Sequence, residues 1–178
     1  MRQTNTSRDL AEMFTMRNLQ RAWEATAQKH TAPGIDGVTV EAFARNWRSR
    51  LGRLQDDILT GAYRPYPYLV FPKPKPNGGV RELVNGTLRD KIVARAAAAE
   101  LSERHDGRLL PQSYAYRPHK GALKAVSAVE RHYTMATHAV RADIESFFDT
   151  LDHGILRDTL LGFGEPPAVA DFLLRCTA

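Results

Sequence analysis

The stretch HAVRADIESFFDTLDH, residues 138–153, decides how the rest of the chain is interpreted. Its start is apolar and prone to form a strand, and it leads into Asp143 and Ile144. Hard cations such as Mg²⁺ or Mn²⁺ need oxygen ligands at fixed geometry, and a strand end holds such a ligand more rigidly than a loop. The stretch therefore predicts a buried strand that presents Asp143 to a metal ion. The competing role is a cap or turn, which aspartate fills far more often.

Length and composition bound the class of protein. The 178 residues are 43% hydrophobic, which suits one domain, or a large and a small lobe. Cys176 is the single cysteine, so an intramolecular disulfide is impossible and a reducing, cytoplasmic setting is expected. No apolar run approaches the roughly 20 residues of a membrane span, and the N-terminal sequence has no signal-peptide core. We therefore expect no membrane partner.

The charge is unevenly distributed along the chain. Residues 61–125 carry twelve basic and five acidic side chains, net +7, whereas residues 126–178 carry four basic and eight acidic ones, net −4. A basic middle followed by an acidic end suits a protein that holds a polyanion beside metal ions. A solvated basic face explains the charge alone equally well.

A β-hairpin is predicted in the basic region. The dense prolines of residues 63–72 indicate an edge strand, and Asn77-Gly78-Gly79 is typical of a tight hairpin turn. The hairpin brings Lys75 of one strand close to Arg81 of the other. Such a pair can clamp a triphosphate through charge-assisted hydrogen bonds. Charges that discourage edge-to-edge aggregation are the alternative.

Helices are predicted around this hairpin from apolar spacing and capping signals, and the alanines of residues 88–105 indicate close packing against a neighbouring element. Their approximate ranges are 8–27, 40–60 after Thr39, 88–105, 122–133, 154–161 and from 168 onward. A turn is predicted at APGIDGV, residues 32–38, because glycine allows positive φ and aspartate bonds locally. The stretch QSYAYRPHKG, residues 112–121, places basic groups beside aromatics, which suits either phosphate and base contacts or a packed loop.

Four segments in this order resemble one family. They are MRNLQRAWEATAQKHTAPGIDGVTVEAF (16–43), YLVFPKPKPNGGVREL with TLRDKIVARA (68–83 and 87–96), SYAYRPHKGALKAV (113–126) and VRADIESFFDTLDH (140–153). Together they resemble the N-terminal part of bacterial reverse transcriptases, most closely the group II intron type. The resemblance spans most of the chain.

The resemblance implies an α+β, right-handed polymerase fold, with fingers and an incomplete palm. Residues 1–87 would form the fingers, with the N-terminal helices, the GIDG loop and the basic hairpin. Residues 88–178 would form a partial palm that carries the first catalytic aspartate on a strand, with the thumb absent. Helices would pack on a small antiparallel sheet beside the hairpin.

The resemblance also implies roles for individual residues. Asp143 matches the first catalytic aspartate, and the backbone carbonyl of Ile144 would join it on the metal. Phe148 matches the ring that packs under the nucleotide sugar and excludes a 2′-hydroxyl. The residues that match nucleotide-binding positions are Lys75, Arg81, Phe148 and Arg117, and the candidates for nucleic-acid contact are Lys73, Arg64, Lys120 and Arg89. Asp149 and Asp152 are interpreted as structural.

Two departures from the family pattern affect this interpretation. Residues 83–87, LVNGT, stand where the family has an LGIPT-like stretch, and we expect the missing proline to loosen that turn. No aromatic-x-Asp-Asp stretch follows Asp143 in this sequence. Two-metal phosphoryl transfer needs carboxylates on both sides of the ions. A missing region or a second polypeptide would therefore have to supply the Asp-Asp turn.

Three functions remain open at this stage. The first is RNA-directed DNA synthesis with an RNA template, a DNA or RNA primer and dNTPs, by a chain that is inactive alone. The second is a non-catalytic RNA-binding or assembly module on the same scaffold. The third, RNA-templated RNA synthesis, is disfavoured by the bulky Phe148. The biological setting also stays open among intron mobility, phage defence, CRISPR spacer acquisition and diversity generation.

Overall fold

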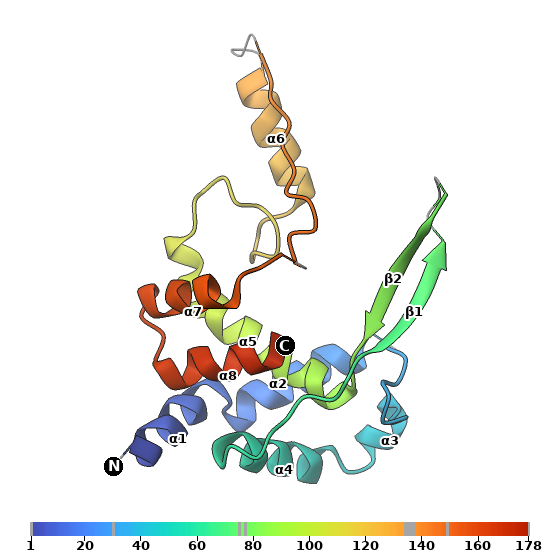
Figure 1. The fold of residues 1–178 in the computed structure, drawn as a ribbon, viewed down its shortest axis with the longest axis vertical. Helices are drawn as coiled ribbons and strands as arrows, with labels where there is room; N and C mark the ends of the chain where they lie inside the picture. The colour runs from blue at the N-terminus through green and yellow to red at the C-terminus, as the bar shows by residue number, and fades with distance from the viewer. Residues whose placement is uncertain are drawn as a thin grey trace.

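The computed structural model describes residues 2–29, 31–74, 76, 78–133, 138–148 and 150–177. Figure 1 shows a body of packed helices from which two parts project, a β-hairpin and a long arm. The hairpin consists of β1 (Leu69–Pro74) and β2 (Val80–Asn85). The arm consists of α6 (Ala122–Tyr133) and the segment 138–148 that follows it, which ends in a turn at 145–148.

The body is built from helices that the sequence predicts, with two of the predicted helices divided. Its elements are α1 (Arg2–Met13), α2 (Met16–Ala27), α3 (Val40–Ala44), α4 (Trp47–Leu59), α5 (Leu88–His105), the 3₁₀ turn η1 (Asp106–Arg108), α7 (His153–Gly162) and α8 (Pro167–Thr177). Thr15 divides the helix predicted at 8–27, because its hydroxyl accepts the Asn18 N–H at 3.1 Å and caps the start of α2. Thr39 caps α3 as predicted, and Asn46 separates α3 from α4.

The core crosses the boundary expected between residues 87 and 88. Phe172 of α8 is fully buried, with its ring centroid 5.0 Å from that of Phe14 and 5.6 Å from that of Tyr63. Leu88 and Ile92 of α5 join the same cluster. The segments 1–87 and 88–178 therefore share one hydrophobic core in the described structure. None of the described helices is long and apolar enough to cross a membrane.

Small side chains bring α2 and α5 close together, as the alanine-rich sequence of α5 predicts. Ala96 and Ala97 are buried against α2. Asn18, which is also buried, donates from Nδ2 to the carbonyl oxygens of Met13 at 2.8 Å and Ala96 at 3.0 Å. Because a buried amide without partners is costly, these two bonds fix how the helices meet.

The C-terminal helices are tied to the end of α5 by a buried carboxylate. Glu165, in the turn between α7 and α8, contacts Arg104 at 3.1 Å and His105 at 2.6 Å. Asp152 caps α7 by accepting the Ile155 N–H at 2.9 Å, which confirms its predicted structural role. Asp149 lies outside the described residues.

The hairpin is confirmed, and its register is defined. β1 and β2 are antiparallel, with Lys73 opposite Arg81 and Phe71 opposite Leu83. Gly78 and its neighbour Gly79 have φ of 84° and 83°, which glycine adopts without strain. This two-stranded sheet is the only one among the described residues, and every β1 residue is exposed. The arrangement of helices on a second small sheet beside the hairpin stays a prediction.

The strand predicted before Asp143 is wrong for this structure. Residues 138–144 have no strand assignment, and all of them are exposed, including Val140 at 95%. A strand needs a hydrogen-bonded neighbour, and the described residues provide none for this segment. The segment instead returns along α6, where Ala139 lines the same apolar cavity as Ala125 and Val129.

Candidate nucleic-acid interface

Two cations share one face of the hairpin. Lys73 and Arg81 are directly opposite in the register, and both are exposed. Side chains of opposed residues point to the same face, where like charges repel each other. This face therefore has the electrostatic character of an anion site. Lys75, which is predicted from the sequence to lie close to Arg81, is outside the described residues. Lys73, a candidate for nucleic-acid contact, is the residue opposite Arg81 in the described register.

The base of the hairpin is fastened to the GIDG loop. Nδ2 of Asn85 donates to the carbonyl oxygens of Ala32 at 3.2 Å and Pro33 at 2.8 Å. Nζ of Lys91 donates to Oδ1 of Asn85 and to Oγ1 of Thr31, both at 2.6 Å. Partial burial lowers the pKa of Lys91, although the Asp36 carboxylate opposes this shift.

This fastening corrects one expectation about the LVNGT stretch. The turn was expected to be loose because it lacks proline, but Asn85 provides side-chain bonds across it. Gly34 also approaches the Gly86-Thr87 backbone so closely that a Cβ atom there would lie 2.6 Å from the Thr87 Cα. The loop and the hairpin base therefore form one packed unit.

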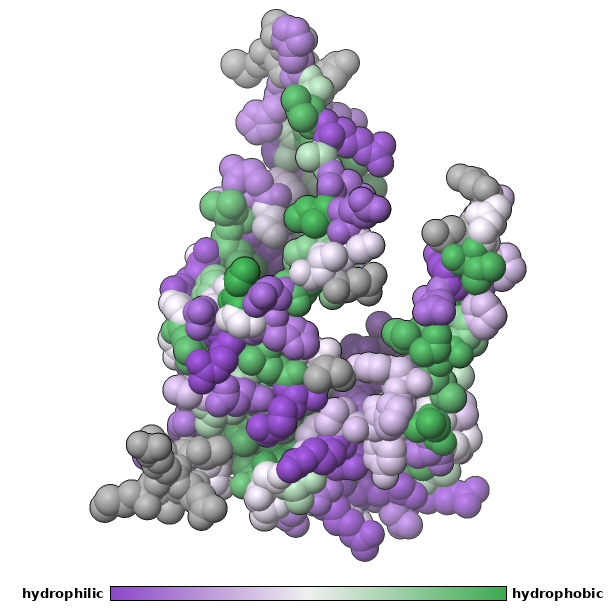
Figure 2. Space-filling model, in the orientation of Figure 1, coloured by the Kyte–Doolittle hydropathy of each residue, from purple (hydrophilic) through white to green (hydrophobic). Residues whose placement is uncertain are grey.

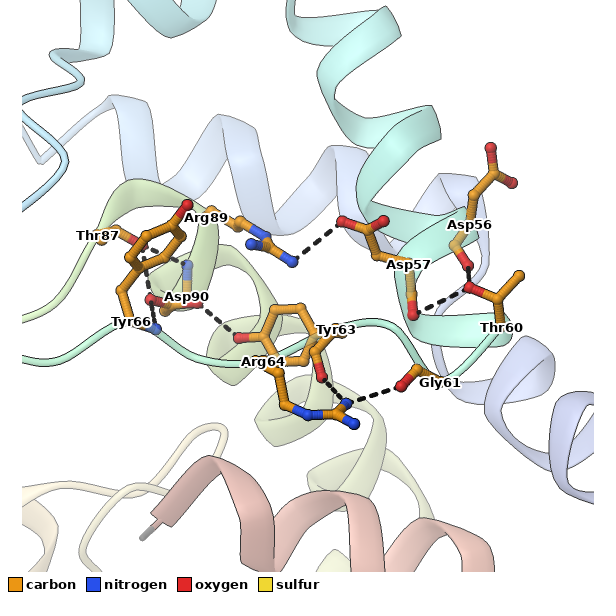
Figure 3. A network of polar contacts seen from close by, with 10 residues as sticks. All are labelled: Asp56, Asp57, Thr60, Gly61, Tyr63, Arg64, Tyr66, Thr87, Arg89 and Asp90. Atoms are coloured by element: carbon orange, nitrogen blue, oxygen red, sulfur yellow. Dashed lines mark hydrogen bonds and ion pairs between the residues drawn. The ribbon is translucent and has the colours of Figure 1, made fainter.

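Asp90 organises the chain that enters the hairpin, as Figure 3 shows. Its carboxylate accepts from the Tyr63 hydroxyl at 2.7 Å, the Tyr66 N–H at 3.0 Å and the Thr87 hydroxyl at 2.7 Å. Burial, together with the Asp90 bond, raises the pKa of Tyr63 well above its usual range. Asp90 was not among the residues predicted from the sequence, although the Thr87-x-x-Asp90 spacing is a capping signal.

Arg64 and Arg89 lie on either side of this network. Nη1 of Arg64 donates to the Gly61 and Tyr63 carbonyl oxygens, both at 2.7 Å, while the residue stays exposed. Arg89 is more enclosed: it pairs with Asp57 at 3.1 Å and lies over the Tyr63 ring at 4.7 Å. Contact of these two arginines with nucleic acid stays a prediction.

The Arg117 guanidinium donates its hydrogen bonds to residues of its own loop. Its side chain is 8% exposed, and its five N–H groups match five acceptors within 3.2 Å. Three of the acceptors belong to Asp106, namely its two carboxylate oxygens and its backbone carbonyl oxygen. The other two are the backbone carbonyl oxygens of Leu110 and Ser113. All N–H groups of the Arg117 guanidinium are therefore used inside the loop, and its role as a nucleotide ligand stays a prediction.

A basic cavity lies where this loop meets α6. It has a volume of about 360 Å³ and is lined by Tyr114, His119, Lys120, Lys124, Ser127 and Arg131. Nζ of Lys120 donates to the Pro111 carbonyl at 2.7 Å and lies 4.9 Å from the Tyr114 ring centroid. No carboxylate lines the cavity among the described residues, so its electrostatic potential favours an anion.

Asp143 and Phe148 lie on the exposed segment of the arm. Phe148 is 81% exposed and meets Phe147 edge to face, with ring centroids 5.6 Å apart. Figure 2 shows a hollow between the arm and the hairpin. Asp143 and Ile144 are exposed as well, and no group of three metal-ligating side chains occurs among the described residues. The donor set described for this chain therefore does not fit a metal centre by itself.

Comparison with known proteins identifies relatives of this chain. It is 30% identical to protein YkfC of Escherichia coli over 149 residues, 77% of this chain and 39% of YkfC. It is 25% identical to the putative COX1/OXI3 intron 2 protein of Saccharomyces cerevisiae over 160 residues, 89% of this chain and 18% of that protein. The group II intron-encoded protein LtrA of Lactococcus lactis is 24% identical over 121 residues, 67% of this chain and 20% of LtrA.

No protein-family profile matches the chain. The chain spans at most about two fifths of the length of the relatives named above. The intron-encoded proteins among them belong to the group that the four sequence segments resemble, and the similarity extends over 67–89% of this chain. This chain is therefore a relative of the group II intron-encoded proteins.

Proposed function

We propose that this chain is the N-terminal part of an RNA-directed DNA polymerase, with fingers and an incomplete palm. It would help to transfer a nucleotidyl group from a dNTP to a primer 3′-hydroxyl on an RNA template. The observation that supports this proposal is the cationic pair Lys73 and Arg81, which lie opposite each other on the exposed hairpin. Figure 2 shows a hollow between this hairpin and the arm that carries Asp143. The relationship to group II intron-encoded proteins agrees with it.

The hairpin and the arm have separate tasks in this proposal. Arg81 and Lys73 would bind the triphosphate, because a desolvated anion between two cations gains charge-assisted hydrogen bonds. The exposed ring of Phe148 would pack under the deoxyribose and leave no room for a 2′-hydroxyl. Both tasks require the arm and the hairpin to close over the nucleotide.

The metal chemistry needs groups beyond those described. Mg²⁺ or Mn²⁺ would activate the nucleophile and neutralise the leaving pyrophosphate when bound. Asp143 and the Ile144 carbonyl provide oxygen donors, but further carboxylates are required to complete such a centre. A second polypeptide or a further region that carries an Asp-Asp turn would supply them. We assign no catalytic step to this chain alone.

Nucleotide binding tests the hairpin part of this proposal. We would titrate the purified chain with dTTP and compare Arg81→Gln with Arg8→Gln, which removes the same charge from a side chain that is 78% exposed on α1. Arg81→Gln should weaken dTTP binding about tenfold or more, because one charge-assisted bond is lost. Equal affinity in both variants would contradict the proposal.

Reconstitution tests the catalytic part. We would mix the chain with the part of YkfC outside the matched 149 residues, an RNA template, a DNA primer and dNTPs. Primer extension should require both polypeptides and should be lost in Asp143→Asn, because that change removes a charged metal ligand. Extension that survives Asp143→Asn would refute the assignment of Asp143.

A non-catalytic RNA-binding module is the second candidate. It is favoured by the exposed, strand-free setting of Asp143 and by the basic cavity at Lys120 and Lys124. RNA affinity that falls steeply with salt but does not respond to Mg²⁺ or dNTPs would support this candidate. Lys124→Gln should then weaken RNA binding, while Asp143→Asn should not.

A further inference from the structure

A further cavity lies beside the GIDG loop, which contributes Asp36 to its lining. It has a volume of about 300 Å³ and is lined by residues of the loop, α3, α4 and the start of α5. We call it the arginine pocket; its lining is Asp36, Val38, Phe43, Arg50, Arg53, Leu54, Asp57, Tyr66 and Arg89. Its size is at the lower end of the range for small-molecule sites.

The pocket holds more positive charge than the protein neutralises. The side chains of Arg50 and Arg53 are exposed, and they make no hydrogen bond or ion pair to any residue that the structure describes. The Arg50 guanidinium lies over the Phe43 ring, 5.4 Å from its centroid. Arg89 uses one of its N–H groups on Asp57 and is held between the Tyr63 and Tyr66 rings at 4.7 and 5.7 Å. Three guanidinium groups therefore converge on one hollow that Asp36 and Asp57 only partly balance.

Asp57 does not neutralise Arg53, so the positive charge of Arg53 can still interact with a ligand in the pocket. Asp57 is four residues after Arg53 on α4, a spacing that normally allows a helical ion pair. It contacts Arg89 of α5 instead, as Figure 3 shows. Arg53 is thereby left without a carboxylate partner among the described residues. Asp36 is likewise engaged, because its Oδ1 accepts the Val38 N–H at 3.2 Å.

The floor of the pocket differs from its rim. Phe43 and Leu54 are buried beneath the arginines, and Tyr66 provides an aromatic face that is 45% exposed. Guanidinium groups suit the oxygens of a phosphate, while an aromatic and apolar surface suits a sugar or a base. The combination therefore fits a nucleotide unit better than it fits a small inorganic anion.

We propose that the arginine pocket binds a phosphate-bearing nucleotide unit, either in an RNA strand or as a free nucleotide. Arg50, Arg53 and Arg89 would hold the phosphate, and Tyr66 would contact the base or sugar. This site is separate from the Lys73 and Arg81 hairpin face, so the inference does not depend on polymerase activity.

The test compares two double variants with the same change of charge. Arg50→Gln with Arg53→Gln removes two positive charges from the lining of the pocket. Arg45→Gln with Arg48→Gln removes the same charge from two exposed arginines nearby that do not line it. Binding of a labelled 12-nucleotide single-stranded RNA would be measured by fluorescence anisotropy between about 50 and 200 mM salt. AMP and inorganic phosphate would be measured in separate arms by calorimetry.

We expect the pocket variant to bind RNA about tenfold more weakly, with a salt slope reduced by about 1.4 for two lost phosphate contacts to a single strand. The control variant should stay within about twofold of the parent chain. Loss confined to RNA identifies a strand as the ligand, and a parallel loss of AMP binding identifies a free nucleotide. Either result supports the proposal.

Two outcomes would overturn it: equal weakening in both double variants, which indicates general attraction, or no weakening in either. A circular dichroism spectrum checks that each variant is folded. Arg50→Lys with Arg53→Lys provides a second measure, because lysine keeps the charge but loses the bidentate geometry. Its affinity should lie between those of the parent and the glutamine variant, and parent-like affinity in both pocket variants would refute the site.

Discussion

Nζ of Lys91 lies 2.6 Å from Oδ1 of Asn85, and this contact joins α5 to the last residue of β2. The same two side chains bond the backbone carbonyl of Ala32 in the GIDG loop. The exposed hairpin thus has a rigid base, although none of β1 is buried. Any motion of the hairpin over a ligand would therefore involve the part of β1 and β2 that lies between Asn85 and the turn, and not the base.

Asn85→Ala tests this fastening. The change removes two bonds to loop carbonyls and the acceptor of Lys91, so it should lower the free energy of unfolding by about 1–2 kcal/mol. Amide hydrogen exchange should quicken in the loop at 31–37 and in β2. Asn46→Ala is the matched control, because Asn46 makes no side-chain cap bond, and it should change stability by less than about 0.5 kcal/mol.

Gly34→Ala tests the close approach of the loop to Thr87. The new Cβ would lie 2.6 Å from the Cα and the N of Thr87, and backbone atoms cannot rotate away. We expect a loss of about 1–3 kcal/mol in urea unfolding. Gly52→Ala, inside α4 with nothing within 4 Å of its Cβ, should instead stabilise the chain by roughly 0.5–1 kcal/mol. A neutral Gly34→Ala would contradict the packing described.

Acid should weaken the loop that Arg117 holds. The hydrogen bonds from Arg117 hold the pKa of Asp106 below its ordinary value of 3.8. A carboxyl group with a lowered folded pKa stabilises the protein above its ordinary pKa, and that contribution is lost as pH falls through the folded value. Limited proteolysis of residues 106–121 should accelerate as pH drops below about 4. Asp106→Asn should already be cleaved faster at neutral pH and should show less further change with acid.

Cys176 should react slowly as a nucleophile. Partial burial in the core raises the pKa of its thiol to about 11, so little thiolate exists near pH 8. Modification by iodoacetamide at pH 8 should be at least about tenfold slower than that of a small thiol, and should recover in denaturant. A rate equal to that of the small thiol in the folded chain would contradict this burial.

The arm should make the isolated chain associate with itself. Leu123 is 86% exposed, and Val126, Val129, Val140 and Phe148 are exposed on the same projection. Apolar side chains gathered in this way favour contact with another surface. Sedimentation should show oligomers at tens of micromolar, and Leu123→Lys with Val129→Lys should reduce them. A stable monomer at all concentrations would oppose this prediction.

The local structure of this chain was readable from its sequence because its signals are short-ranged. Thr39 caps a helix as its capping signal predicts, and Asp152 caps α7, in agreement with its interpretation as structural. The Asn77-Gly78-Gly79 turn predicts a hairpin whose two strands pair in the structure. The alanines of α5 predicted close helix packing, and Ala96 is buried against α2. Each of these depends on neighbours within a few residues or on one buried face.

Tertiary structure decided the partners of the charged groups. Asp57 pairs with Arg89 across 32 residues rather than with Arg53 on its own helix, and Arg117 turns inward to Asp106. It also decided against a strand before Asp143, because an apolar, β-prone segment becomes a strand only when another strand supplies its hydrogen bonds. The sequence determines which charged side chains lie within reach of each other on one helix or loop. Long-range packing determines which of them form ion pairs.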